Sequence, residues 1–287
     1  MTRFDLQAKK RAWRRRVDTG RLRPVVRVGL DAVIAVEILG ARVADLRRRR
    51  PAPIDTSDVT AVIKTFERPR QSRRLVRSIR RLHPDVRILL LDDSVVPREV
   101  PGAELVSLPH NSGISVGRNT ALAMVDTPYA VMLDDDFVFE RRTRFDRPLA
   151  WMDEHPDVDI LGGLVVNLPD WSRADYSRVP LFPGAAPPKV PIGSEIGGLR
   201  VFAKVPNFLL VRTDRVREVG WSEELKVLEH RDFFTRASGT LVTAHDPAWR
   251  VLHARNPFDR GTPVRMQNQR EAEAFLWQRY VADRGRA

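Results

Sequence analysis

Three consecutive aspartates, Asp134, Asp135 and Asp136, directly follow an apolar run in the stretch YAVMLDDDFVF. Neighbouring carboxylates repel one another and are costly to remove from water. A solvated turn is the ordinary interpretation of acids at a strand end, but apolar residues enclose this run on both sides. If the strand persists, Asp134 and Asp136 point the same way, which suits a hard divalent cation that takes oxygen ligands.

The elements that would position these acids alternate between strands and helices. A β-branched run predicts a strand at 59–66, and further strands are expected at 86–94, 104–109 and 129–136, with helices at 68–82 and 117–125. This order favours an α/β fold with a mostly parallel sheet and helices on both faces. Such sheets bind ligands at the carboxyl ends of their strands.

Polar side chains follow the other strands at the same edge. Lys64 and Thr65 end the first strand, and Asp92 and Asp93 end the second. For Asp92 and Asp93 alone, a solvated turn is an equally good interpretation. Together with the three aspartates, these side chains predict one crevice that holds a ligand and a cation.

Six ordered blocks resemble a known family: VIKTFERP, SIRRLHPDV, DDS, GRNTAL, DTPYAVMLDDDFVF and VPNFLLVRTDRVREVG. They are similar to the catalytic domain of the β-1,4-N-acetylgalactosaminyltransferases, within the family 2 glycosyltransferases of GT-A (Rossmann-like) fold. The resemblance spans residues 58–255. It implies an inverting, metal-dependent enzyme that transfers N-acetylgalactosamine or a related hexose. The donor is a UDP-sugar, and the acceptor is a hydroxyl of a glycan or glycolipid.

The resemblance also implies roles for individual residues. Contacts to the nucleotide sugar are expected from Lys64, Thr65, Asp92, Asp93, Arg118, Asp134, Asp135 and Asn207. Ligands for Mn²⁺ or Mg²⁺ are expected from Asp134, Asp136 and His253. The alternatives are a surface arginine for Arg118, a satisfied polar residue at a strand bend for Asn207 and a packing residue for His253.

The stretch LKVLEHRDFFTRA predicts a helix that carries the general base. Glu229 and Asp232 lie three residues apart on one face of it. Family 2 enzymes commonly have a base at the position that His230 occupies here, so three candidates remain. We favour Asp232, because a carboxylate stays deprotonated near neutral pH with little tuning, with His230 orienting a substrate and Glu229 holding the cluster. A charged surface cluster is the alternative.

The acceptor side is expected in a long Pro- and Gly-rich loop at 171–198, because loops of this length are usually functional or disordered. Trp171 and Tyr176 in this loop could stack on a sugar, or could anchor the loop. The preceding strand is expected to bend at Gly162 and Gly163. The last helix, at 265–285, is expected to be structural.

Charge is concentrated at the N-terminus. The chain has a net charge of +12, and its first 53 residues hold 15 Lys or Arg and 5 Asp or Glu, so the remainder is nearly neutral. A helix at 28–46 lies between basic clusters, and its four charged residues argue against a membrane span. Residues 1–50 therefore predict peripheral contact with an anionic membrane, self-association, or packing on the body. No recognised motif supports nucleic-acid binding.

The expected organisation is a basic helical extension (1–53) and a GT-A domain (54–287), with a nucleotide-binding half (58–140), an acceptor and catalytic half (141–260) and a C-terminal helix (261–287). The absence of cysteine excludes disulfides and thiolate nucleophiles, and fits a cytoplasmic protein, peripheral at the inner face of the membrane. A nucleotidyltransferase would open with a Gly-rich loop, which VIKTFERP lacks. A non-catalytic binding module would lose the acids or the base cluster, and this chain keeps both.

Overall fold

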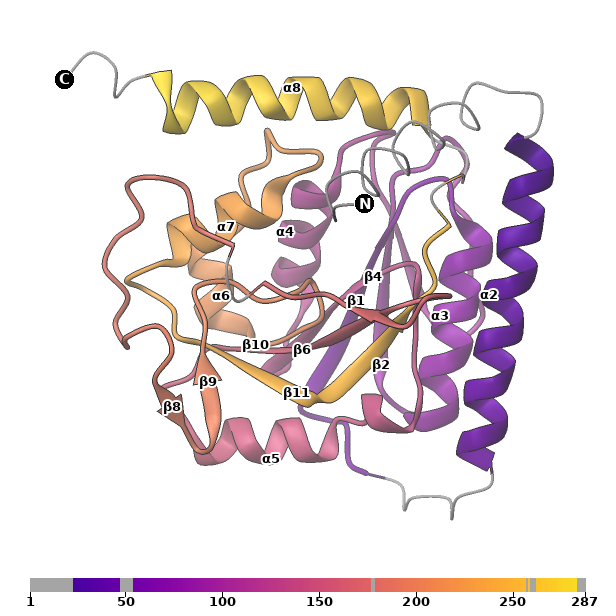
Figure 1. The fold of residues 1–287 in the computed structure, drawn as a ribbon, viewed down its shortest axis with the longest axis horizontal. Coiled ribbons are helices and arrows are strands. Elements are labelled where there is room, and N and C mark those ends of the chain that lie inside the picture. The colour runs from indigo at the N-terminus through magenta and orange to yellow at the C-terminus, as the bar shows by residue number, and fades with distance from the viewer. Residues whose placement is uncertain (1–22, 47–53, 177–178, 257, 259–261, 283–287) are drawn as a thin grey trace, which may run out of the picture.

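A mixed sheet forms the centre of the molecule (Figure 1). The computed structural model describes residues 23–46, 54–176, 179–256, 258 and 262–282, so the basic clusters predicted at 9–16 and 47–50 lie outside it. Among the described residues, the strands follow the order β3-β2-β1-β4-β10-β6-β11-β9-β8. The first four of these are parallel, as predicted: β1 (Val59–Thr65), β2 (Arg87–Asp92), β3 (Glu104–Ser107) and β4 (Tyr129–Asp134).

The second half of the sheet departs from a purely parallel arrangement. β10 (Leu209–Arg212) lies between β4 and β6 (Ile160–Asn167) and is antiparallel to both. β11 (Thr243–His253) then runs parallel to β6. The short strands are β5 (Phe137–Val138), β7 (Ser172–Arg173), β8 (Glu195–Ile196) and β9 (Leu199–Val201).

Helices cover both faces of the sheet (Figure 1). The apolar sides of α3 (Pro69–Leu82) and α5 (Asp146–Glu154) pack on one face. Those of α4 (Ile114–Met124), α6 (Thr213–Val219) and α7 (Glu229–Ala237) pack on the other. A 3-10 turn, η1 (Arg141–Thr143), precedes α5, and α8 (Thr262–Tyr280) crosses the top of the view in Figure 1.

Two helices begin at positions that the sequence analysis did not predict. α4 begins three residues before Gly117, because Gly113 adopts φ 96° and lets the chain turn into the helix. α7 begins only at Glu229, because Leu228 adopts a left-handed φ of 63°. Glu229 and His230 therefore occupy the first turn of α7 rather than its middle.

The N-terminal helix α2 (Arg23–Leu46) confirms the helix predicted there and packs on the body. Ile34 and Ile38 are buried in a cluster with residues of β5, β6 and β11. Asn256 donates to the backbone oxygen of Arg27 (2.9 Å) and to Asp31 (2.7 Å). None of the described helices is both long enough and apolar enough to cross a bilayer.

Gly162 and Gly163 lie within β6 and make room for the core. A Cβ on Gly162 would lie 2.4 Å from Val205, and one on Gly163 would lie 2.4 Å from Phe208. The pairing of β6 with β11 is irregular at this point, because the register shifts between Asp246, which pairs with Gly163, and Arg250, which pairs with Leu164. The two glycines thus bring Val205 and Phe208 close to the sheet.

Replacing Gly163 with alanine should lower the free energy of unfolding by about 1–3 kcal/mol, because the added methyl overpacks a site closed by Phe208 and Trp249. Denaturant unfolding followed by circular dichroism measures the change. Gly40→Ala is the matched control: no atom lies within 4 Å of its Cβ position in α2, so it should be neutral or stabilising. Equal destabilisation by both substitutions would contradict the packing argument.

Candidate active site

The acidic run forms a turn rather than a continued strand. β4 ends at Asp134, and Asp135 and Asp136 form the turn that leads into β5. Arg68 Nη1 donates to both Asp135 and Asp136, at 3.1 Å each. Asp134 instead accepts from Arg118 Nη2 at 3.3 Å. The strand does not continue to Asp136, so the alternation of a strand does not place Asp134 and Asp136 on the same side.

The carboxyl ends of β1 and β2 meet at this edge, as the parallel order predicted. Lys64 forms a buried ion pair with Asp93, which also accepts from the backbone N–H of Gly113 at 2.8 Å. Burial lowers the pKa of Lys64, and the charge of Asp93 opposes that shift. Thr65 Oγ1 donates to Asp135 at 2.8 Å. The first two strands and the acidic turn thus form one connected polar network.

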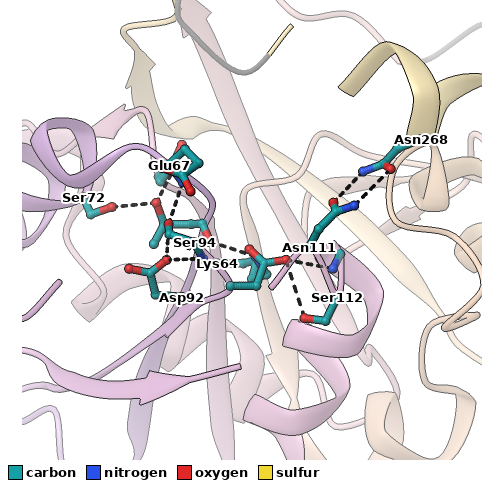
Figure 2. Close-up of polar contacts among 12 residues, drawn as sticks. Lys64, Glu67, Ser72, Asp92, Ser94, Asn111, Ser112 and Asn268 are labelled. Atoms are coloured by element: carbon teal, nitrogen blue, oxygen red, sulfur yellow. Dashed lines mark hydrogen bonds and ion pairs between the residues drawn. The ribbon is translucent and has the colours of Figure 1, made fainter. Parts of the chain in front are cut away.

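Asp92 shapes the loop that follows β2 (Figure 2). Its carboxylate accepts from the backbone N–H groups of Ser94 (2.9 Å) and Arg98 (3.0 Å). In the same view, Asn111 exchanges hydrogen bonds with Asn268 of α8, the shorter at 2.8 Å. The C-terminal helix therefore contacts the edge where a nucleotide is expected.

Arg118 links the two halves of the site. It is only 2% exposed and donates to Glu229 at 2.8 Å as well as to Asp134. The surface alternative for Arg118 is therefore wrong. Burial raises the pKa of Asp134 to about 6, although the charge of Arg118 opposes the shift. Trp221 lies under the guanidinium, 5.3 Å from it, and helps to fix its position.

His230 lies beside Glu229 and is oriented by the backbone. Its Nε2 is 2.7 Å from the carbonyl oxygen of Val205, so Nε2 carries the proton and Nδ1 keeps its lone pair. Burial lowers the pKa of His230 well below its ordinary value, with the charges of Lys204 and Arg118 acting in the same direction. The ring is therefore neutral at neutral pH.

Asp232 points into the body of the protein. Its carboxylate is fully buried and accepts from Tyr280 of α8 (2.7 Å), Ser222 (2.8 Å) and Arg236 (3.0 Å). A carboxylate that already holds three donors is poorly placed to accept a proton from an acceptor. This geometry does not support our preference for Asp232 as base, and burial of both Glu229 and Asp232 excludes the charged-surface alternative.

The expected acceptor-side residues separate in the structure. Tyr176 stacks edge-on to His230, with centroids 5.6 Å apart, and Lys204 lies 4.9 Å from its ring. Trp171 instead donates its indole N–H to Glu37 of α2 at 2.9 Å. Asn207 has a buried side-chain oxygen that accepts no hydrogen bond from any described residue. Tyr176 and Asn207 are thus positioned to meet a ligand more directly than Trp171.

Two further residues belong to the site although the sequence analysis did not identify them. Arg68 forms ion pairs with both Asp135 and Asp136 of the acidic turn. In the sequence, the only indication of this role was its position four residues after Lys64, close to the end of the first strand. Lys204 is buried in a mostly apolar stretch, VFAKVPNF, which was the available signal. Burial, together with the charge of Arg231, lowers the pKa of Lys204 to about 8.

Asp136 and His253 fit two ligands of a divalent cation. His253 Nε2 is 3.2 Å from Asp136, and Nδ1 is 2.8 Å from Asn167 Oδ1. Because that oxygen can only accept a hydrogen bond, Nδ1 carries the proton. Nε2 therefore keeps its lone pair and can bind a metal ion, which is the arrangement common for metal-binding histidines. Within the described part of the chain, no group of three or more metal-ligating side chains is assembled, and Asp134 is engaged by Arg118.

Comparison with known proteins agrees with this fold. The chain is 36% identical over 194 residues to β-1,4 N-acetylgalactosaminyltransferase 1 of Homo sapiens, covering 64% of this chain and 36% of the relative. It is 30% identical over 202 residues to β-1,4 N-acetylgalactosaminyltransferase 2 of Mus musculus, covering 68% and 39%. The chain thus spans well under half the length of these curated relatives.

Solved structures resemble the fold at lower sequence identity. TarS 1-349 of S. aureus in complex with UDP matches with a TM-score of 0.53 and 17% identity, over 68% of this chain and 60% of that one. The complex of the same protein with UDP-GlcNAc gives a TM-score of 0.52 over 69% and 60%. This likeness confirms the predicted GT-A architecture.

The sequence profile of glycosyl transferase family 2 matches residues 60–207, which is just over half of the chain. That range runs from β1, through the acidic turn, to Asn207. It therefore includes both the expected nucleotide-binding edge and the acids. The chain belongs to glycosyl transferase family 2.

Proposed function

We propose that this protein is an inverting glycosyltransferase that moves a sugar from a UDP-sugar to a hydroxyl of a glycan or glycolipid. The observation that carries the proposal is the convergence of four polar groups at one sheet edge. These groups are Lys64 with Asp93, Thr65 with Asp135, Asp134 with Arg118 and Glu229, and Asp136 with His253. The names of the curated relatives support N-acetylgalactosamine as the transferred sugar. The bound ligands named for TarS support a uridine diphosphate donor.

The site matches the charge changes of such a reaction. Departure of a nucleoside diphosphate leaves negative charge that must be stabilised as the sugar becomes oxocarbenium-like. Asp136 and His253 would hold Mn²⁺ or Mg²⁺, which would neutralise part of that charge. The buried cations Arg118 and Lys204 would contribute from the side of Glu229.

Recognition of the donor is assigned to the β1 and β2 edge. Asp93 and Asp135 offer carboxylate oxygens that Lys64 and Thr65 hold in place, and such oxygens can accept from a uracil N–H or a ribose hydroxyl. Asn207 has an unused buried oxygen that can accept from a sugar hydroxyl. Asp92 would act indirectly, by fixing the loop after β2.

His230 is the general base in this proposal. The Val205 carbonyl fixes its tautomer, so that Nδ1 is the accepting atom, and burial keeps the ring neutral and able to take a proton. Glu229 holds Arg118, and Asp232 anchors α7 to α8. Tyr176, edge-on to His230, offers its ring to the acceptor sugar, while Trp171 supports the loop from the side of α2.

A panel of donors tests the proposal. Purified protein is incubated with UDP-N-acetylgalactosamine, UDP-N-acetylglucosamine, UDP-galactose or UDP-glucose, with Mn²⁺, Mg²⁺ or a chelator, and released UDP is measured. We expect release from a UDP-hexosamine that rises when a glycan or glycolipid acceptor is added. UTP with a sugar phosphate is the control for the nucleotidyltransferase alternative. Pyrophosphate release from that control, without UDP release from any UDP-sugar, would overturn the assignment.

A further inference from the structure

We propose that the outer face of α2 and the arginines of α3 next to it form one docking surface for an anionic lipid bilayer. α2 lies at the outer edge of the molecule and runs for 24 residues, which is roughly 36 Å of helix. Large apolar side chains are exposed along its whole length. They are Val25, Val28, Val33, Val36, Leu39, Val43 and Leu46, and the exposed fraction reaches 69% at Val25 and 74% at Leu46.

The outer face of α2 carries no charge. At about 100° per residue, these apolar side chains share one side of the helix with alanines and glycines. The charged residues fall on the other side, and three of them contact the body: Asp31 meets Asn256, Glu37 meets Trp171, and Asp45 accepts from the Arg141 backbone. A surface helix normally turns its charged side to water, so this orientation marks a face that another surface covers.

A cluster of arginines borders this face. A cavity of about 300 Å³ between α2 and α3 is lined by Arg42, Arg70, Arg73, Arg74 and Arg77. The four from α3 follow the spacing of one helical stripe. Arg42, Arg70, Arg73 and Arg77 form no ion pair with any residue that the structure describes, and Arg42 Nε is buried without an acceptor there. Guanidinium groups in this arrangement suit phosphate oxygens.

Charge complementarity selects a bilayer as the occupant. A second copy of the chain would cover the apolar side chains, but its α2 offers no exposed carboxylate on that face for the arginines. An anionic bilayer supplies both partners: acyl chains for the apolar side and lipid phosphates for the arginines. The excess of 15 basic over 5 acidic residues in the first 53 acts in the same direction. The surface lies outside the site proposed for sugar transfer.

Vesicle sedimentation of the full chain tests the surface. Phosphatidylcholine vesicles, with or without about one third phosphatidylserine, are the probes. We expect binding that requires phosphatidylserine, falls at least about tenfold in Leu39→Asp, and falls about fivefold for each of Arg73→Glu and Arg77→Glu. Trp277→Asp in α8 and Arg215→Glu in α6 are matched controls at exposed positions on other elements and should bind as the unaltered chain does. Circular dichroism and UDP release, where present, should be unchanged in every variant.

Three results would overturn the inference. The first is no sedimentation of the full chain, or equal sedimentation with neutral vesicles. The second is a loss in Leu39→Asp but none in either arginine variant, which would remove the arginines from the surface. The third is a concentration-dependent dimer in analytical ultracentrifugation that Leu39→Asp abolishes while vesicles bind neither form, which would assign the face to a second copy.

Discussion

Replacing Asp136 with asparagine should lower sugar transfer by at least about a hundredfold while the fold remains intact. Asparagine keeps the shape of the side chain but removes the charge that faces His253 and Arg68. A hard cation binds a neutral amide less well than a carboxylate, so the diphosphate would lose its counter-charge as it departs. Acceptor-dependent UDP release measures the effect, and isothermal titration with Mn²⁺ measures cation binding separately.

Asp126→Asn is the matched control for this prediction. Asp126 is a surface residue whose ion pair with Arg87 is exposed, so its loss should change neither activity nor stability appreciably. Retention of full activity in Asp136→Asn, or undiminished activity of the unaltered chain in chelator, would show that transfer does not depend on a cation at this carboxylate.

Replacing His230 with alanine should also lower transfer by about a hundredfold or more, the usual scale of a general base, with UDP binding near normal.

Replacing Asp232 with asparagine should instead lower the stability of the fold. Asp232→Asn leaves Arg236 and Tyr280 facing a neutral group in the interior, and we expect it to cost about 3 kcal/mol. Transfer assays at saturating substrates and thermal unfolding distinguish the two effects.

Glu229→Gln completes the comparison, because Glu229 holds Arg118 from the same turn of α7. It should weaken donor binding more than it slows transfer at saturating donor. If Asp232→Asn proves folded and inactive while His230→Ala transfers normally, then Asp232 is the base and the network around it must open when an acceptor binds. Near-normal transfer in all three variants would move the chemistry away from α7.

The parallel half of the fold and the location of the site follow from local patterns. The β-branched run at 59–65, the apolar run at 129–134 and the helical spacing of Leu75 and Ile79 are short-range signals that reflect burial directly. Once the order of elements is known, the rule for parallel sheets brings Lys64, Asp93 and the acidic turn to one edge. The structure agrees with that step.

The features that were missed depend on contacts between distant residues. Which way Asp232 points is decided by Tyr280, 48 residues later, and no local pattern records that hydrogen bond. Lys204 looks like an unfavourable charge within an apolar stretch until Tyr176 and Glu229 are placed beside it. The acidic turn was misjudged because strand alternation was extended beyond Asp134, where β4 ends.

Because β10 lies between β4 and β6, the two halves of the sheet assemble at different times as the chain is synthesised. β1 to β4 all lie within the first 134 residues, and each has its partner among them. β6 joins them only after Leu209–Arg212 has been made, and its other edge is filled only when β11 ends at His253. Pairings this distant are slow to form, so the half that would bind nucleotide takes shape first. β6 pairs early only with the short β7, and its residues 160–162 wait for β10 until more than 40 further residues have been made.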